Sequence, residues 1–295
     1  MRAIIPVAGL GSRFKPITDN IQKCLLPVGG QPILGHIINR LNSINITELV
    51  LVVGCFADQV KEYIDTLDLD YKVLFVEQKE RLGLGHAVLH ALDYSNEEVI
   101  ILLGDAIIDM DYKKFIENKN NMVAVDKVLD PKRYGIIDIR GNKISSFIEK
   151  PDNPPSDFAL VGVYKINSQL ELQQSINKLI KNNITTKNEY QLTDALRLMV
   201  ESGLDFEYQN VEKNLDCGIP ENIIMINKYF LEQAQLNYIS PYANIDNSTI
   251  NYCTIMDNCK IVNSELNNVI VLNDSNVNDK VITDAIIGYD KIFYK

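Results

Sequence analysis

A glycine-rich turn and two nearby cations are the first residues of this chain that could do chemistry. The turn that follows the first apolar run contains Ala8, Gly9 and Gly11, and Arg13 and Lys23 come shortly after it. Glycines allow a close backbone approach, and the N–H groups of such a turn can surround a polyphosphate. Arginine and lysine neutralise phosphate charge. The pattern predicts a loop that binds a triphosphate and stabilises a departing pyrophosphate.

Two common phosphate-binding motifs do not fit this turn. A dinucleotide-binding fingerprint requires a third glycine where the chain has Phe14. It also requires an acidic residue at the end of the second strand, and that strand instead ends in Val53-Gly54-Cys55. A P-loop requires Gly-Lys followed by Ser or Thr, which is absent from the sequence.

A lone carboxylate, Asp105, follows another apolar run and the dipeptide Leu103-Gly104. An aspartate at the end of a strand is more often a cap or turn residue than a metal ligand. Its role therefore depends on the elements around it.

Alternating apolar runs and helical patterns occupy the first part of the chain. The sequence predicts strands over residues 3–7, 49–53, 73–76 and 99–103, and helices over 32–41, around Val60 and Ile64, and over 85–92. Solid apolar strands that alternate with helices indicate an α/β, doubly wound, mostly parallel (Rossmann-like) domain. Ligands of such sheets bind at the carboxyl ends of the strands, which is where the glycine turn and Asp105 are expected.

The last part of the chain has a different pattern, rich in Asn and Asp. Aliphatic residues recur in steps of five, five and six: Ile245, Ile250, Ile255, Ile261, Leu266, Val271, Val277, Ile282 and Ile287. This period indicates a short β-helix-like repeat segment with asparagines at its corners. An irregular, Asn-rich β-meander is the alternative.

The residues after the first strand resemble the signature of the sugar-1-phosphate nucleotidyltransferases, a family that includes glucose-1-phosphate thymidylyltransferase and UTP–glucose-1-phosphate uridylyltransferase. The matching segments are Gly9-x-Gly11-x-Arg13-x-x-Pro16-x-Thr18, Lys23-x-Leu25-x-Pro27-Val28 and Gln31-Pro32-Ile33. Gln22 departs from the pattern, because the family usually has proline before the lysine. The resemblance implies an Mg²⁺-dependent transferase.

The resemblance also implies a nucleotide site. Gln78 and Gly83 would read the nucleobase, since a glutamine amide can pair with a pyrimidine edge. The form Gly-Leu-Gly-His-Ala at 83–87 favours uracil, and His86 is expected to begin a helix and face solvent. Asp105 and Asp216 resemble the two aspartates that hold the metal ion, and carboxylate oxygens suit Mg²⁺.

Six residues match the sugar-phosphate site of the family: Tyr134, Gly135, Glu149, Lys150, Gly162 and Lys187. The resemblance implies that Glu149 accepts hydrogen bonds from sugar hydroxyls and that Lys150 binds the phosphate. Lys187 replaces an arginine, so it keeps the charge but loses the bidentate fork. Glu189 and Asp194 are expected to begin and cap the following helix.

The resemblance predicts a catalytic domain over residues 1–236, followed by the repeat segment over 237–295. The implied reaction moves a nucleoside monophosphate from an NTP, with UTP or dTTP favoured, to a sugar 1-phosphate, with glucose 1-phosphate as the default. The catalytic residues would be Arg13, Lys23, Asp105 and Asp216. There are three alternatives: a cytidylyltransferase acting on a phosphorylated alcohol such as phosphocholine, a sugar-nucleotide sensor, and an acyltransferase. The last is disfavoured because residues 237–295 contain no histidine.

Composition limits the partners. The formal net charge of -10 disfavours a nucleic-acid partner, which would select a basic face. No run of about 18 apolar residues or signal-peptide pattern occurs, so no membrane association and a cytoplasmic location are expected. Five scattered cysteines without a CxxC pair are expected to be free thiols. A homo-oligomer formed through the repeats is also expected.

Overall fold

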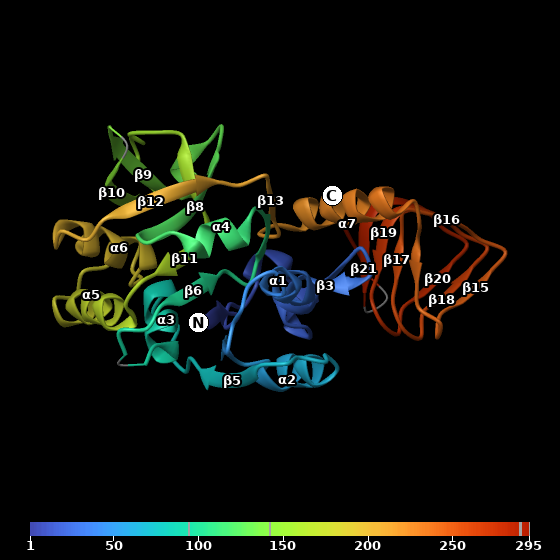
Figure 1. Ribbon diagram of the computed structural model, residues 1–295. Helices are drawn as coiled ribbons and strands as arrows, with labels where there is room; N and C mark the ends of the chain where they lie inside the picture. Colours follow the sequence, from blue (N-terminus) through green and yellow to red (C-terminus); the bar gives the residue numbers. More distant parts are fainter. Residues whose placement is uncertain (94, 142, 289–290, 295) are drawn as a thin grey trace. The chain divides into compact units, whose positions relative to one another are not determined.

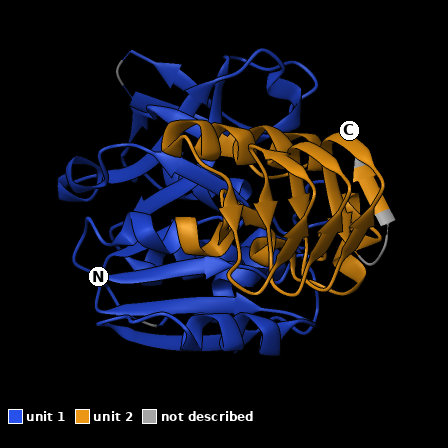
Figure 2. Cartoon of the chain, turned by 90° about the vertical axis from the view of Figure 1, so that its right-hand side faces the viewer, with its two compact units in different colours: residues 1–9, 37–214 blue, residues 10–36, 215–295 orange. Residues whose placement is uncertain are grey.

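The chain forms two compact units, each built from two stretches that are distant in sequence. The computed structural model describes residues 1–93, 95–141, 143–288 and 291–294. Unit 1 contains residues 1–9 and 37–214, and unit 2 contains residues 10–36 and 215–295 (Figure 2). Helix α1 (Ile33–Leu41) and strand β13 (Lys213–Asp216) cross the division between the units. The domain boundary predicted at 236–237 stays a prediction.

Unit 1 is built on a mixed sheet of nine strands (Figure 1). Its parallel part has the order β5 (Lys72–Glu77), β4 (Glu48–Val53), β1 (Arg2–Pro6) and β6 (Val99–Leu102). These four strands confirm the strands predicted from the apolar runs. The Val, Ile and Leu residues of β1, β4 and β6 are buried, as expected for strands that are covered on both faces, whereas those of β5, at the end of the strand order, are only partly buried.

The other strands of unit 1 are mostly antiparallel, so the prediction of a mostly parallel sheet holds only for β5 to β6. Strand β11 (Phe158–Ile166) runs antiparallel to β6, to β8 (Asn121–Lys127) and to β9 (Gly135–Arg140). Strand β10 (Lys143–Glu149) forms a hairpin with β9, and β12 (Phe206–Asn210) runs parallel to β8. The short connection between β9 and β10 allows only an antiparallel pair.

Amphipathic helices cover this sheet. They are α2 (Ala57–Asp65), α3 (Leu84–Ala91), α4 (Tyr112–Glu117), α5 (Gln169–Lys181) and α6 (Leu192–Glu201). Strand β7 (Ala106–Asp109) lies between β6 and α4 in sequence. Ser168 caps α5 by accepting a hydrogen bond from the Glu171 N–H, the first half of a capping box. None of the helices in the described part of the chain combines the length and apolar character needed to cross a bilayer.

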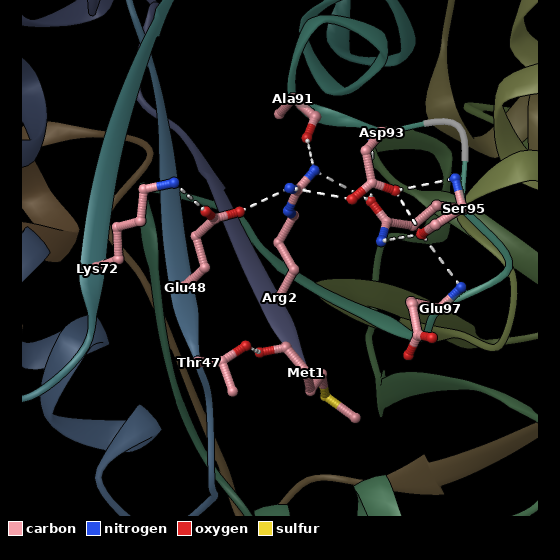
Figure 3. A network of polar contacts seen from close by, with 10 residues as sticks. Met1, Arg2, Thr47, Glu48, Lys72, Ala91, Asp93, Ser95 and Glu97 are labelled. Carbon is pink, nitrogen blue, oxygen red and sulfur yellow. Dashed lines mark hydrogen bonds and ion pairs between the residues drawn. The ribbon is translucent and has the colours of Figure 1, made fainter.

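A polar network joins the strands of unit 1 at their amino ends (Figure 3). The Arg2 guanidinium lies 2.6 Å from Glu48 Oε2 and 3.0 Å from Asp93 Oδ2, and Lys72 Nζ lies 2.9 Å from Glu48 Oε1. Burial would raise the pKa of Glu48, but the hydrogen bonds and charges of Lys72 and Arg2 outweigh it and hold that pKa below its usual value. The network secures the end of the sheet opposite to the carboxyl ends of the parallel strands.

Unit 2 contains helix α7 (Pro220–Ala234) and a strand-rich C-terminal region. Its strands are β14 (Tyr238–Ile239), β15 (Asn244–Asp246), β16 (Thr249–Asn251), β17 (Thr254–Ile255), β18 (Lys260–Val262), β19 (Glu265–Val271), β20 (Asn276–Asn278), β21 (Val281–Gly288) and β22 (Lys291–Tyr294). Strands β14 to β21 pair in parallel with an offset of sixteen residues, as in Asn244 with Lys260 and Lys260 with Asn276. Steps of five, five and six residues span the same length.

The periodic aliphatic residues form the interior of this region. Ile245 and Ile250 are partly buried, and the other seven residues of the series are buried. Asparagines at the corners have positive φ and bond to the corner sixteen residues later: Asn247 to Asn263 at 2.7 Å, and Asn263 to Asp279 at 3.2 Å. Asparagine tolerates this backbone conformation and pairs through its side chain, which explains the density of Asn and Asp.

Residues 10–36 belong to unit 2 because they pack on α7. Strands β2 (Pro27–Val28) and β3 (Gln31–Pro32) form a hairpin whose turn, Gly29-Gly30, has positive φ at both residues. The buried Asn227 side chain of α7 accepts a hydrogen bond from Gly29 N at 3.0 Å. The same side chain contacts the Thr254 hydroxyl at 2.6 Å, so one residue joins the hairpin, the helix and the strand-rich region.

Candidate functional site

The glycine-rich turn is closed by contacts within unit 2. Gly11 has φ of 60°, and a Cβ at this position would lie 3.0 Å from both Lys23 Cβ and Thr18 Cγ2. The Thr18 hydroxyl donates to the Gly11 carbonyl at 2.8 Å. Only glycine combines this left-handed conformation with such close neighbours. The turn is therefore built around Gly11, and its contact with a polyphosphate stays a prediction.

The two predicted cations follow the turn in short 3-10 helices. Arg13 lies in Ser12–Phe14 and is exposed, and Lys23 begins Lys23–Leu25 and is half-buried. Lys23 Nζ lies 5.6 Å from the centre of the Phe14 ring, within the range of a cation–π contact. Ala8 and Gly9, the other predicted residues of this motif, belong to unit 1. A Cβ on Gly9 would meet no atom within 4 Å.

The two predicted metal ligands each follow a strand. Asp105 comes after β6 in unit 1, and Asp216 ends β13 in unit 2. Asp216 Oδ1 accepts a hydrogen bond from Gly218 N at 2.7 Å, an Asx turn that leads into α7. Both side chains are half-buried and offer oxygen ligands of the kind that Mg²⁺ prefers. Their convergence on one metal ion stays a prediction.

The segment predicted to read the nucleobase surrounds Gln78, which is 6% exposed. Gln78 Nε2 lies 3.2 Å from the Gly83 carbonyl oxygen and 3.2 Å from His86 Nδ1. The expectation that His86 merely faces solvent is therefore wrong, because its ring contacts Gln78 from the first turn of α3. Burial, followed by the nearby charge of His90, lowers the pKa of His86, and Glu80 opposes this effect.

Gly83 and Gly85 pack against the backbone of Tyr190. Gly83 has φ of 113°, and a Cβ there would lie 2.7 Å from the Tyr190 carbonyl oxygen. Gly85 N donates to the same oxygen at 2.8 Å, and Tyr190 N donates to Leu82 O at 2.8 Å. The predicted base segment and the segment after Lys187 are thus neighbours in unit 1, although they are about a hundred residues apart in sequence.

Four of the predicted sugar-site residues meet where β9 and β10 pair. Glu149 Oε2 accepts a hydrogen bond from the Thr193 hydroxyl at 2.8 Å, and Lys150 Nζ lies 3.1 Å from Glu149 Oε1. Lys150 has positive φ, and its N–H donates to the Tyr134 carbonyl at 3.0 Å. A Cβ on Gly135 would lie 2.9 Å from Thr193 Oγ1 and 3.1 Å from Glu149 Oε2. Glycine at 135 leaves room for this pair.

Gly162 connects the sugar-site strands to the loop that carries Asp105. It has φ of 93° and lies where the pairing of β11 with β8 is irregular. Its carbonyl accepts a hydrogen bond from Leu103 N at 2.8 Å. Gly162 is thereby placed against the segment that leads from β6 to Asp105.

Lys187 lies at the tip of a tight turn closed by Thr186 and Glu189. Lys187 and Asn188 both have positive φ, as in a type I′ turn, and the N–H of each closing residue donates to the carbonyl of the other, at 3.0 and 3.2 Å. The Lys187 side chain is exposed. The Thr186 hydroxyl donates to Asp194 Oδ2 at 2.7 Å, which fixes the turn to the first turn of α6. The expectation that Glu189 and Asp194 begin and cap α6 is wrong. The helix begins at Leu192 with Gln191 at the N-cap position and no side-chain cap, Asp194 lies in its first turn, and Glu189 closes the preceding turn.

Sequence reasoning missed two residues of this region, Thr193 and Tyr164. Tyr164, fully buried on β11, has a raised pKa because of burial and then because of the charges of Glu149 and Asp105. Thr193 is buried at the start of α6. No role was assigned to either from the sequence, and the packing of α6 on β10 and the pairing of β11 with β9 bring them close to the predicted site residues.

Comparison with known proteins accords with this arrangement. The family model described as nucleotidyl transferase matches residues 2–233. The chain is 33% identical over 240 residues to "Bifunctional protein GlmU" of Methanococcus maripaludis, which covers 79% of this chain and 55% of that protein. It is 32% identical over 239 residues to the "Bifunctional sugar-1-phosphate nucleotidylyltransferase/acetyltransferase" of Sulfurisphaera tokodaii, covering 79% and 56%.

A solved structure shows the same fold. A putative glucose-1-phosphate thymidylyltransferase from Bacillus anthracis superimposes with a TM-score of 0.68 at 25% identity, covering 78% of this chain and 95% of that one. The chain spans about half the length of the two curated relatives named above. The matched residues, 2–233, include every predicted site residue. The chain belongs to the nucleotidyl transferase family.

Proposed function

We propose that this protein transfers a nucleoside monophosphate from an NTP to a sugar 1-phosphate and releases pyrophosphate. The observation that carries the proposal is the Glu149 carboxylate, 8% exposed, held by Thr193 and flanked by Lys150. A fixed carboxylate beside a cation can accept hydrogen bonds from sugar hydroxyls while the cation contacts the phosphate. Family membership over residues 2–233 supports the same reaction class.

The reaction is an in-line displacement. A phosphate oxygen of the sugar 1-phosphate attacks the α-phosphorus of the NTP, and the bond between that phosphorus and the oxygen bridging to the β-phosphate breaks. The nucleophile is already an anion at neutral pH, so no side chain has to remove a proton from it. Catalysis then depends on positioning and on neutralising charge.

In this proposal, the cations act on two different phosphate groups. Arg13 and Lys23 stabilise the pyrophosphate that leaves, and the backbone N–H groups around Gly11 bind the triphosphate. Lys150 holds the sugar phosphate in line. Asp105 and Asp216 would hold Mg²⁺, which supplies further neutralisation of phosphate charge when bound.

The favoured nucleotides are UTP and dTTP. A carbonyl oxygen only accepts hydrogen bonds, so the amide atom of Gln78 that faces the Gly83 oxygen has to be the nitrogen. Gln78 Oε1 is therefore the atom that remains for a base. Uracil and thymine offer an N3–H donor to such an acceptor, whereas cytosine has an acceptor at N3. A cytidylyltransferase is therefore disfavoured.

For unit 2 we propose that the strand-rich region is a short β-helix that supports a homo-oligomer. The parallel pairs with a constant offset of sixteen residues support the β-helix. Light scattering of the full chain tests the assembly, and a mass equal to one chain would contradict it.

The test of the function is a pyrophosphate-release assay with Mg²⁺. UTP, dTTP, CTP, ATP and GTP are each combined with a panel of sugar 1-phosphates and with phosphocholine. Turnover with UTP or dTTP and one sugar 1-phosphate is expected. Turnover only with CTP and phosphocholine would establish the alternative enzyme class. Nucleotide binding without turnover in any combination would indicate a sensor.

A further inference from the structure

We propose that His86 is a positioning residue that sets nucleobase choice by locking the Gln78 amide with its oxygen towards the base. This inference rests on the proposed function, because it assumes that Gln78 faces the nucleobase. The orientation of the Gln78 amide follows from its contact with Gly83. Gln78 Nε2 lies 3.2 Å from the Gly83 carbonyl oxygen, which cannot donate.

The contact with Gln78 also determines the tautomer of His86. Gln78 Nε2 also lies 3.2 Å from His86 Nδ1, and an amide nitrogen can only donate. Nδ1 therefore accepts, and the ring proton of neutral His86 is on Nε2. A histidine whose tautomer is determined in this way is a one-directional acceptor for Gln78.

The two contacts of the Gln78 nitrogen leave the amide oxygen as the atom that can meet a ligand. The Gly83 oxygen and His86 Nδ1 engage both hydrogens of the Gln78 amide, and within the described residues its oxygen accepts no hydrogen bond. A base that donates from N3 is favoured, and one that accepts at N3 meets the oxygen lone pairs. Without His86, one of the two bonds that oppose rotation of the amide is lost, so cytosine is rejected less strongly.

The His86 side chain is not part of the hydrophobic core. It is half-buried, while the core side of α3 consists of Ala87, Val88 and Ala91. Its ring also contacts the ring of the exposed His90 edge to face, with the two ring centroids 4.6 Å apart. Replacing His86 therefore removes the contact to Gln78 without opening the core, and His90 provides a matched control on the same helix.

The experiment compares the affinity for MgUTP and MgCTP by titration calorimetry of the full chain. In the wild-type protein UTP is expected to bind more tightly than CTP. In His86→Leu the ratio of the two affinities falls by about threefold to tenfold, the effect of one neutral hydrogen bond. His86→Asn restores the ratio, since its side-chain oxygen can accept from Gln78, and His90→Asn leaves the ratio unchanged.

An unchanged ratio in His86→Leu would overturn the inference, as would equal affinities for UTP and CTP in the unchanged protein. An equal loss in His86→Asn and His86→Leu would also overturn it, because it would show that only the ring shape matters. Pyrophosphate release is measured in parallel. If His86→Leu turns over UTP and its selectivity for UTP over CTP is unaltered, the inference is wrong and the proposed function stands. If nucleotide binding is selective and depends on His86 but no combination gives turnover, the proposed function is wrong and the inference stands.

Discussion

The Thr193 hydroxyl donates a 2.8 Å hydrogen bond to Glu149 Oε2, across 44 positions of sequence. Glu149 ends β10, and Thr193 lies in the first turn of α6. The pair faces Gly135, where a Cβ would approach both side chains within about 3 Å. A helix and a hairpin that pack together thus orient the carboxylate that we assign to the sugar.

Thr193→Val tests this relationship. The substitution keeps the shape of the side chain but removes the donor, so Glu149 loses its fixed orientation. We expect the KM for the sugar 1-phosphate to rise at least about tenfold, since hydrogen bonds to charged groups are worth about 1.5–3 kcal/mol and each 1.4 kcal/mol is tenfold. The KM for the NTP should not change. Thr193→Ser should behave as the unchanged protein, and an increase in the NTP KM alone would contradict the assignment.

Asp105→Asn and Lys23→Ala test the chemistry of the triphosphate. Asn keeps the shape of Asp105 but removes the charge that would hold Mg²⁺, and Ala at 23 removes a cation from the departing pyrophosphate. Each change is expected to abolish most of kcat while circular dichroism and the unfolding midpoint stay unchanged. Turnover close to normal in either variant would show that the assigned residue does not take part in the reaction.

Gly11→Ala and Gly9→Ala separate two uses of glycine. Alanine at 11 meets Lys23 and Thr18 at 3.0 Å and a left-handed backbone, which costs about 1–2 kcal/mol. We expect Gly11→Ala to lower the free energy of unfolding by at least that amount. Alanine at 9 meets no atom within 4 Å, so stability should be retained while NTP affinity falls. Equal stability of the two variants, measured by urea unfolding, would contradict the argument for Gly11.

Asn227→Ala tests the core of unit 2. The Asn227 side chain bonds to Gly29 N, to the Thr254 hydroxyl and to the Tyr252 carbonyl. Its loss leaves three polar groups without this partner, and we expect a loss of about 3 kcal/mol or more in the free energy of unfolding. Met225→Ala, on the exposed side of the same helix, is the control and should cost less than about 0.5 kcal/mol.

The selectivity for UTP over CTP should depend on pH through His86. Burial and then His90 lower its pKa below the ordinary 6.5, Glu80 opposes this, and the ring is neutral at pH 7. As pH falls through the lowered pKa, Nδ1 gains a proton and can no longer accept from Gln78. The affinity ratio should therefore decrease towards low pH in the unchanged protein.

The comparison at each pH is with His86→Asn, whose ratio should stay constant except for the protonation of the bases themselves. A parallel decline in both proteins would remove His86 as the cause. Because the folded protein lowers the pKa of His86, the unfolded chain binds the proton more readily. The free energy of unfolding should therefore decline as the pH falls below 6.5.

The sequence alone determined the elements that depend on short-range patterns. Solid apolar runs identified β1, β4 and β6, because a strand buried on both faces has to be apolar throughout, and a similar run identified β5, which is only partly buried. The steps of five, five and six residues identified the inward aliphatics of unit 2, since each has to reach the interior at a regular interval. The order of motifs likewise located Gly11, Lys23 and Glu149. Gly11 lies in a turn, Lys23 begins a short 3-10 helix and Glu149 ends a strand.

Tertiary structure alone decided the partners of those residues. The antiparallel course of β11 and the hydrogen bond of Thr193 to Glu149 join segments whose local sequences show no sign of one another. The contact of His86 with Gln78 spans only eight residues, but it depends on how α3 packs beside the end of β5. Residues 10–36 also join unit 2 only through contacts such as Asn227 with Gly29. The physical reason is that periodicity records which side of an element is buried, whereas the identity of the neighbour depends on how whole elements pack.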